Sequence, residues 1–172
     1  LLCCWHQTNR WNRRLEEIYC SQINLHRSPT ANLSLNEWLT GRSGQTIPKI
    51  ALVQEPHNVN SKVSNISKNF QIFVGKTNGN IRACIVTTSS IGAWLLGQYS
   101  NEDQVAIAFK AGSKTFIMAS TYMPYDSKEL PPPVITKELI AFSAQKGWGL
   151  IIGTDANSHN EVWGSTDTNK RG

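Results

Sequence analysis

The chain has 172 residues, which is enough for one domain with a buried core. Hydrophobic residues make up 40 % of it, and this excludes disorder as the default state. Seventeen Lys and Arg against twelve Asp and Glu give a net charge of +5, which favours a polyanionic partner. No apolar run reaches the roughly 18 to 20 residues that span a bilayer, and the first residues lack the pattern of a signal peptide. We therefore expect an intracellular protein with no membrane partner.

The first 18 residues mix aromatic, basic and acidic side chains without a clear period. We predict an N-terminal extension over 1–18 with no assigned role, in which Asn12–Glu17 could form a short helix, and one domain over 19–172. An apolar-rich run then predicts a strand from Tyr19 to Leu25.

A strong helix start follows this strand. Ser28 is a typical N-cap and Pro29 suits the first helical position, while Gly41 or Gly44 provides the stop. After the helix, Lys49–Val53 predicts a second buried strand, whose residues Ile50–Val53 are continuously apolar.

The middle of the chain contains hairpin signals. Residues 58–69 are polar and predict a loop, and Phe70–Val74 and Arg82–Thr87 predict two strands. The Asn78-Gly79 pair between these strands is the strongest hairpin signal in the sequence.

A second hairpin and a second helix come next. Gln104–Phe109 and Thr115–Thr121 predict strands joined by a turn at 111–114. Three consecutive prolines at 131–133 break the chain, and Val134–Lys146 predicts a helix.

The last predicted strand is the most informative stretch. Gly147 stops the preceding helix, and the apolar run that ends at Ile152 halts at Gly153-Thr154-Asp155. Asn157 and His159 follow, so groups that can hold a metal, a water or a phosphate crowd into five positions. Strands in pairs with two helices between them predict an α/β layered fold with mixed or antiparallel sheets.

The four cysteines form no C-x-x-C pair and no spacing that suits zinc; they are Cys3, Cys4, Cys20 and Cys84. Cys20 and Cys84 fall inside apolar, strand-like runs, so buried free thiols are favoured over disulfides. The chain begins without Met and ends at Arg171-Gly172 without a closing element, which we interpret as a fragment at both ends.

Several predicted strands end in polar residues: Asn24, Glu55, Tyr122, and Asp155 with Asn157. Each alone has an ordinary explanation, because Asn and Asp end strands in turns and Glu-Pro is a common exit from a sheet. Their shared placement favours one site, since strand ends at one edge of a sheet are where sites are assembled.

The motifs that carry a family resemblance are Gln22–Ser28, Leu52–Pro56, Ser120–Pro124, Gly153–His159 and Trp163–Ser165. In this order they resemble the endonuclease/exonuclease/phosphatase superfamily, which includes pancreatic deoxyribonuclease and the apurinic/apyrimidinic endonucleases. The resemblance is closest to the endonuclease domain of non-LTR (LINE-type) retrotransposons, especially insect-type elements. It implies a deoxyribonuclease-like four-layer α/β/β/α fold, a layered β-sandwich flanked by helices and incomplete at the C-terminus.

The resemblance also implies a Mg²⁺-dependent hydrolysis of a DNA phosphodiester, with Mn²⁺ as a possible substitute and no small-molecule cofactor. Glu55 would be a metal ligand, because carboxylate oxygen suits a hard cation, and Asn24 would support the metal or the phosphate. Tyr122 would donate its hydroxyl to a phosphate oxygen. Asp155 would align or deprotonate the attacking water, and Asn157 would donate to the scissile phosphate.

Other polar residues of the motifs are weaker candidates. His26 and Arg27 adjoin Asn24 and are possible phosphate contacts, although an Arg at a helix start is equally a solvated charge. His159 could contact DNA or simply cap its loop.

One departure from the family pattern matters. Members close the site with a final Asp-His pair near the C-terminus, and nothing after His159 supplies it here. Because losing one member of a catalytic set costs several orders of magnitude, we expect residues 1–172 alone to be inactive or nearly so. The resemblance implies DNA as partner, a reverse-transcriptase domain downstream, and a nuclear site of action.

Two alternatives remain open. A phosphatase of the same superfamily, acting on phospholipid or nucleotide substrates, would use the same core residues. A truncated or degenerate element copy would instead yield a nonenzymatic, nucleic-acid-binding fragment.

Overall fold

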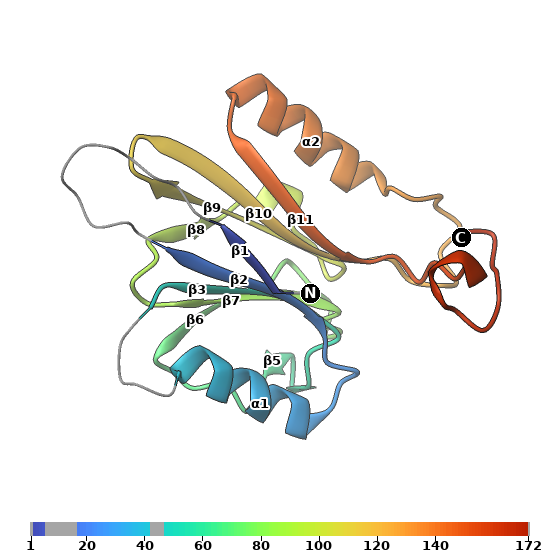
Figure 1. Ribbon diagram of the computed structural model, residues 1–172, viewed down its shortest axis with the longest axis horizontal. Coiled ribbons are helices and arrows are strands. Elements are labelled where there is room, and N and C mark those ends of the chain that lie inside the picture. The colour runs from blue at the N-terminus through green and yellow to red at the C-terminus, as the bar shows by residue number, and fades with distance from the viewer. Residues whose placement is uncertain (1, 6–16, 42–46, 172) are drawn as a thin grey trace.

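The computed structural model describes residues 2–5, 17–41 and 47–171 (Figure 1). The helices are α1 (Pro29–Thr40) and α2 (Val134–Lys146), with short 3-10 turns η1 (Gly97–Tyr99) and η2 (Glu161–Trp163). The strands are β1 (Leu2–Trp5), β2 (Ile18–Asn24), β3 (Lys49–Gln54), β4 (Asn58–Val59), β5 (Lys62–Val63), β6 (Phe70–Phe73), β7 (Ala83–Thr88), β8 (Ala93–Leu95), β9 (Gln104–Ala111), β10 (Lys114–Tyr122) and β11 (Gly149–Asp155). In these described ranges, no helix has the length and apolarity needed to cross a bilayer.

Two sheets face each other, and each carries one helix on its outer side (Figure 1). The first sheet has the strand order β1-β2-β3-β7-β6, and the second has the order β11-β10-β9-β8. α1 packs on the first sheet and α2 on the second. The four layers confirm the predicted α/β/β/α sandwich.

The alternation of side chains along β3 shows how these layers are sealed. Ile50 and Leu52 belong to the core between the sheets, whereas Ala51 and Val53 pack with α1. Successive side chains of a strand point to opposite faces, so a strand covered on both faces must be apolar at every position. This is why β3 contains the continuous apolar run Ile50–Val53.

Both predicted helices are confirmed, with their caps. The Ser28 hydroxyl accepts a hydrogen bond from the Ala31 amide at 3.3 Å, and Pro29 is the first helical residue of α1. α1 ends at Gly41, and α2 ends at Gly147 in the left-handed conformation. The alternative stop for α1, Gly44, lies outside the described residues, and so does the predicted short helix Asn12–Glu17 except for its last residue.

The strands were predicted less completely than the helices. β4 and β5 form a small hairpin inside the stretch 58–69 that was expected to be a loop, and β8 was not predicted. β1 lies within 1–18, where no strand was predicted, and pairs antiparallel with β2 as an edge strand. β4 and β5 are too short to show a period, and β1 and β8 are defined by pairing with strands further along the chain.

The two predicted hairpins differ in their turns. β9 and β10 are joined by the tight turn at Gly112-Ser113, since Ala111 pairs with Lys114. β6 and β7 also pair antiparallel, but Phe73 pairs with Ile85, so the connection spans 74–82 and the Asn-Gly pair lies within a longer loop. The predicted hairpin is therefore confirmed, with the Asn-Gly pair inside its connection.

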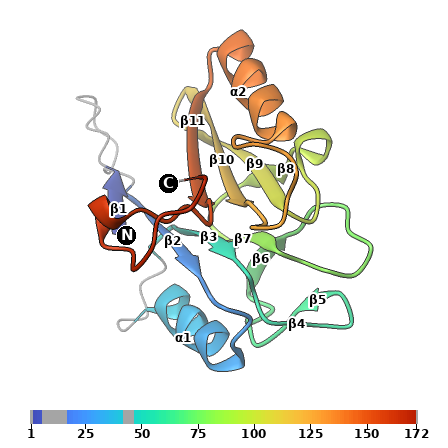
Figure 2. The ribbon, with the colours of Figure 1, turned by 90° about the vertical axis from the view of Figure 1, so that its right-hand side faces the viewer.

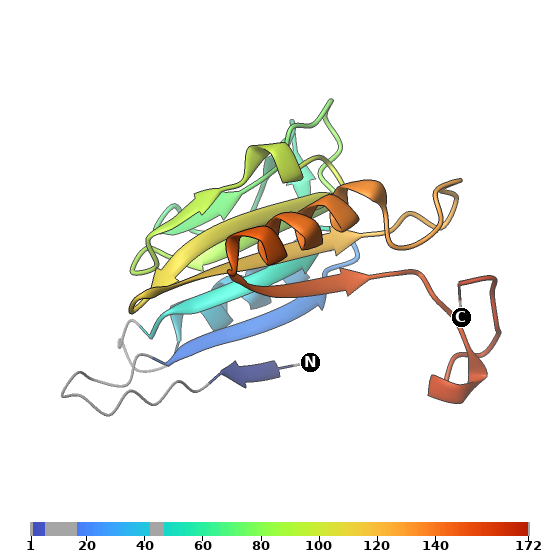
Figure 3. The ribbon, with the colours of Figure 1, turned by 90° about the horizontal axis from the view of Figure 1, so that it is seen from above.

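The direction of four strands determines where the chain gathers its polar residues. β2 and β3 are parallel and joined through α1, and β10 and β11 are parallel and joined through α2. In Figure 3, β2, β10 and β11 run toward the same side of the molecule. The carboxyl ends of all four strands meet at one edge of the sandwich, which Figure 2 views.

The cysteine prediction is confirmed for Cys84, whose thiol is free and fully buried. Burial raises the pKa of Cys84 to about 12. Cys20 is half-buried, and its sulfur lies 3.9 Å from the Met118 sulfur. The side chains of Cys3 and Cys4 lie outside the described part of the chain.

Gly153→Ala tests the close approach of the sheets at this edge. A Cβ on Gly153 would lie 2.8 Å from both Gln22 Cγ and Leu52 Cδ1, atoms of the opposite sheet. We expect the free energy of unfolding to fall by about 1–3 kcal/mol, because the inserted methyl group overpacks the core. Chemical denaturation measures this. Gly92→Ala is the matched control, since nothing lies within 4 Å of a Cβ there; equal losses in both variants would contradict the close approach.

Candidate active site

The predicted strand-end residues come together at the edge where the four parallel strands end. Asn24 is the last residue of β2, and Glu55 follows β3 directly. Tyr122 and Asp155 are the last residues of β10 and β11 and are register partners. Each sheet therefore contributes two residues to one edge.

The side-chain amide of Asn24 joins the two sheets at this edge. Its nitrogen donates to Glu55 Oε2 at 3.0 Å and to Asp155 Oδ2 at 2.6 Å. Its oxygen accepts the backbone N–H of His26 at 2.7 Å, which fixes the orientation of the amide. Two carboxylates from different sheets thus converge on one donor.

Glu55 is held through both its backbone and its side chain. Its N–H donates to the Arg82 carbonyl at 2.8 Å, and its own carbonyl accepts the N–H of Arg27 at 2.8 Å. Arg27 Nε lies 3.5 Å from Glu55 Oε1, and His26 Nδ1 lies 4.0 Å from Oε2. The exposed side chains of His26 and Arg27 therefore flank the Glu55 carboxylate on its solvent side.

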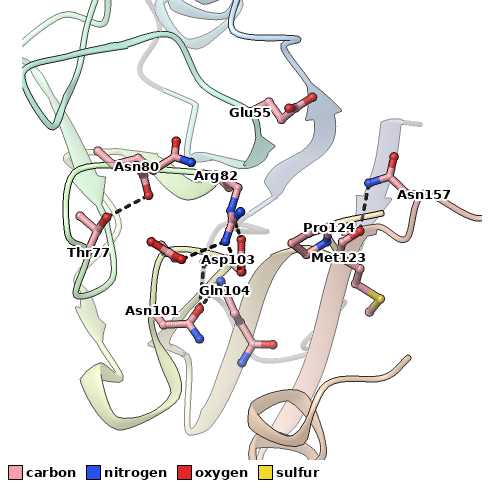
Figure 4. Close-up of polar contacts among 12 residues, drawn as sticks. Glu55, Thr77, Asn80, Arg82, Asn101, Asp103, Gln104, Met123, Pro124 and Asn157 are labelled. Atoms are coloured by element: carbon pink, nitrogen blue, oxygen red, sulfur yellow. Dashed lines mark hydrogen bonds and ion pairs between the residues drawn. The ribbon is translucent and has the colours of Figure 1, made fainter. Parts of the chain in front are cut away.

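Asp155 and Asn157 form a compact turn. The Asn157 N–H donates to Asp155 Oδ1 at 3.0 Å. Figure 4 shows the second contact, in which the Asn157 side-chain nitrogen donates to the Met123 carbonyl at 3.0 Å. The Met123 N–H in turn donates to the Asp155 carbonyl at 2.8 Å. The segment after Tyr122 and the segment after Asp155 are consequently tied together.

Backbone strain concentrates at this edge. His26, Arg27, Glu55 and Asn157 all have positive φ, between 46° and 54°. A residue other than glycine in this left-handed region costs on the order of 1–3 kcal/mol, less for Asn. Such strain persists where the surrounding contacts require it, and it marks this edge as a constrained site.

A buried polar network lies between the two sheets, next to the candidate site. Gln54 is fully buried, and its amide nitrogen donates to Ser120 Oγ at 2.9 Å and to the Gly153 carbonyl at 3.2 Å. Its oxygen accepts from Gln22 Nε2 at 2.8 Å. The bonds from Gln54 to Ser120 and Gly153 cross between the sheets, one residue before Glu55 and two before Asp155. The sequence showed only a polar residue ending an apolar run, and no role was predicted for Gln54.

Arg171 is a second residue that the sequence did not identify. Its guanidinium donates to the carbonyls of Met123 at 2.9 Å and Ala156 at 3.1 Å, and also to that of Pro124. It fastens the C-terminal segment over the turn that carries Asp155 and Asn157. No local pattern in the sequence marks this contact.

His159 lies in the C-terminal segment and is turned toward that segment's own residues. Its Nδ1 contacts Asp167 Oδ1 at 2.8 Å, and its N–H donates to Asn169 Oδ1 at 3.2 Å. Both the His159 and the Asp167 side chains are exposed. The contacts support the loop-stabilising interpretation of His159, and a DNA contact stays a prediction.

The donor chemistry of the edge fits a hard divalent cation. Carboxylate oxygens of Glu55 and Asp155 share one small volume, and Mg²⁺ is commonly bound through one or two carboxylates. Within the described residues, no group of three or more His, Cys, Asp or Glu is arranged to hold a metal. The oxygen of Asn24 is engaged by His26, so Asn24 presents its nitrogen, and its predicted ligand role stays a prediction.

The chain folds as an α/β/β/α sandwich with its polar site at the strand ends, and this fold is similar to that of a known protein. The structure is similar to the endonuclease domain of TRAS1, a telomere-specific non-LTR retrotransposon, with a TM-score of 0.60 and 23 % sequence identity. The similarity covers 88 % of this chain and 64 % of that chain. No family model matches the sequence, and no curated protein matches it. The likeness predicted from the motifs is confirmed for the fold.

Asn24 variants test the convergence of the carboxylates. Asn24→Ala removes the shared donor, and we expect the free energy of unfolding at pH 7 to fall by roughly 2–4 kcal/mol, because two charge-assisted bonds are lost. Asn24→Asp should cost more, since three carboxylates then repel one another, and the extra loss should shrink as the pH falls to about 4. Denaturant titration at both pH values measures this. Asn69→Asp, on an exposed loop, is the control; equal, pH-independent losses would contradict the geometry.

Proposed function

We propose that this chain is the Mg²⁺-dependent endonuclease domain of a retrotransposon polyprotein and hydrolyses a DNA phosphodiester to nick target DNA. The observation that carries the proposal is the Asn24 amide, which gathers Glu55 and Asp155 from two sheets at one edge. The fold shared with the TRAS1 endonuclease domain and the net charge of +5 support it, because DNA is a polyanion.

The reaction needs a nucleophile, a polarised phosphate and a protonated leaving group. Water attacks phosphorus, the bond from phosphorus to the 3′ oxygen breaks, and the proton passes to that oxygen, which leaves a 3′-hydroxyl and a 5′-phosphate. Mg²⁺, or Mn²⁺ in its place, would be held by Glu55 with Asn24 beside it and would draw charge off the phosphate. Exposure of a 3′-hydroxyl would suit priming by a downstream reverse-transcriptase domain in the nucleus.

The chain's own residues take the remaining roles. Asp155 aligns the attacking water and accepts its proton, and its second oxygen is fixed by the Asn157 N–H. Asn157 donates to the scissile phosphate through its side-chain amide, which has a second hydrogen besides the one given to Met123. Tyr122 donates its hydroxyl to a phosphate oxygen. Arg27, His26 and His159 are proposed as contacts to DNA phosphates, with Arg27 nearest to Glu55.

Asp155→Ala and Glu55→Ala test the proposal directly. We expect each variant of the full-length protein to nick supercoiled plasmid about 10³-fold more slowly or worse, because each removes a member of a cooperating set. Chelation of Mg²⁺ should abolish nicking. Lys114→Ala, on the turn at the far end of the second sheet, is the control and should nick normally. Nicking by Asp155→Ala at the wild-type rate would refute the assignment of the site.

Tyr122→Phe isolates one hydroxyl group. Removing a single donor to the transition state commonly costs about 10²-fold in kcat, so we expect kcat to fall by about that factor while KM for plasmid changes little. Tyr125→Phe is the matched control, since Tyr125 is 67 % exposed and lies on the same segment. Equal kcat values for the two variants would remove Tyr122 from the mechanism.

A further inference from the structure

An ion pair near the candidate site connects the two sheets. Arg82 immediately precedes β7 in the first sheet, and Asp103 immediately precedes β9 in the second. Arg82 Nη2 lies 2.7 Å from Asp103 Oδ2 and 2.9 Å from Glu102 Oε1, and Arg82 Nε contacts Asp103 Oδ1 (Figure 4). The guanidinium thus holds Asp103 through the hydrogen bond from Nη2, with Nε in ion-pair contact beside it, which limits how far the two segments can separate.

The backbone carbonyls of the same two residues hold two site residues. The Arg82 carbonyl accepts the N–H of Glu55 at 2.8 Å, and the Asp103 carbonyl accepts the N–H of Tyr122 at 2.8 Å. Glu55 and Tyr122 come from different sheets, and the Gln54–Ser120 hydrogen bond joins their strands, β3 and β10, only within the core. The Arg82–Asp103 pair closes this gap.

We infer that Arg82 is a positioning residue, whose contact with Asp103 fixes Glu55 and Tyr122 relative to each other. The inference rests on the proposed function for its catalytic consequence. Both partners of the pair are anchored: the Arg82 N–H donates to the Glu102 carbonyl at 2.9 Å, and the Asp103 N–H donates to Asn101 Oδ1 at 2.9 Å. A shift of either side chain is therefore transmitted to the backbone.

A direct phosphate contact by Arg82 does not fit its surroundings. The side chain is 22 % exposed, and its charge faces two carboxylates, so the cluster as a whole is not positive. Burial raises the pKa of Asp103, while Arg82 acts in the opposite sense and Glu102 and Asp126 add to the rise. The guanidinium is thus engaged by Asp103 and Glu102.

Amide hydrogen exchange in the full-length protein tests the positioning itself. In Arg82→Met and in Asp103→Asn, we expect the Glu55 and Tyr122 amides to exchange at least about tenfold faster, while the Ile85 and Met118 amides inside the sheets stay protected. Lys114→Met removes the same charge at the far end of the second sheet and should change neither amide. Unchanged exchange at Glu55 and Tyr122 would overturn the inference.

Plasmid nicking and Mn²⁺ binding test the consequence. We expect both single variants to lower kcat about 10²-fold, as a small misplacement of catalytic groups does, and to weaken Mn²⁺ binding, measured by electron paramagnetic resonance of free Mn²⁺. DNA affinity in a chelator should be unchanged. The double variant should be no worse than either single one, because the pair acts as a unit, and Arg82→Lys should be intermediate.

The outcomes separate the possibilities. If the variants have a lower melting temperature but wild-type kcat and Mn²⁺ binding, the pair is merely structural. If DNA binding weakens in Arg82→Met but not in Asp103→Asn, Arg82 is a phosphate contact. Either result overturns the inference. A wild-type protein that nicks no plasmid refutes the proposed function. In that case amide exchange still decides whether the pair holds the two segments.

Discussion

The polar edge depends on how closely the second sheet approaches the first at Gly153. Packed sheets usually lie about 10 Å apart, a gap filled by side chains from both faces. At Gly153 there is no side chain, and Leu52 and Gln22 of the first sheet occupy the space that a Cβ would take. This approach lets the Gln54 amide reach the Gly153 carbonyl, and it brings Asp155, two residues later, to the Asn24 amide.

The convergence of two carboxylates carries an electrostatic cost that the chain offsets locally. Asn24 donates to both acids, Asn157 donates its backbone N–H to Asp155, and Arg27 lies beside Glu55. The amide donors carry no charge, and the charge of Arg27 is exposed to solvent. These groups therefore hold the two carboxylates in place without neutralising their charge. The edge therefore keeps an unbalanced negative charge, and a divalent cation would stabilise it. The same donors would preorganise the acids, so little rearrangement would accompany binding.

Much of the fold was readable from the sequence because its signals are local. Ser28-Pro29 and Gly147 define helix ends through a cap or a left-handed turn, and each needs only a few neighbouring residues. β3 is recognisable because strands buried on both faces are apolar throughout. The apolar run of β11 suggested a strand of the same fully buried kind, which is wrong, because β11 is the edge of the second sheet and Ile151 is exposed. β1 and β8 were missed because an edge strand gains its structure from a distant partner. The strand-end residues were found singly, yet only the register of parallel strands shows that they meet.

The residues that support the site could not be predicted, since their roles arise from contacts between segments far apart in the chain. Gln54 and Ser120 are 66 residues apart, and Arg171 reaches Met123 across 48. The sequence presents Arg82 and Asp103 as ordinary surface charges at strand starts. Together with Gln54 they place two polar bridges between the sheets at one edge, one neutral and buried, the other charged and partly exposed.

These two bridges constrain the site in different ways. The Gln54 bridge lies within the core, where an unpaired amide is costly, so it fixes how closely the sheets approach. The Arg82–Asp103 pair lies just before β7 and β9, and the backbone carbonyls of its two residues hold the N–H groups of Glu55 and Tyr122. Glu55 lies between the Gln54 bridge and the Arg82–Asp103 pair, because it follows Gln54 directly and its N–H donates to the Arg82 carbonyl. Its φ at this position is 48°, in the strained left-handed region. A left-handed Glu is stable only where both neighbours are held, which explains why the strain is found at this residue rather than along β3.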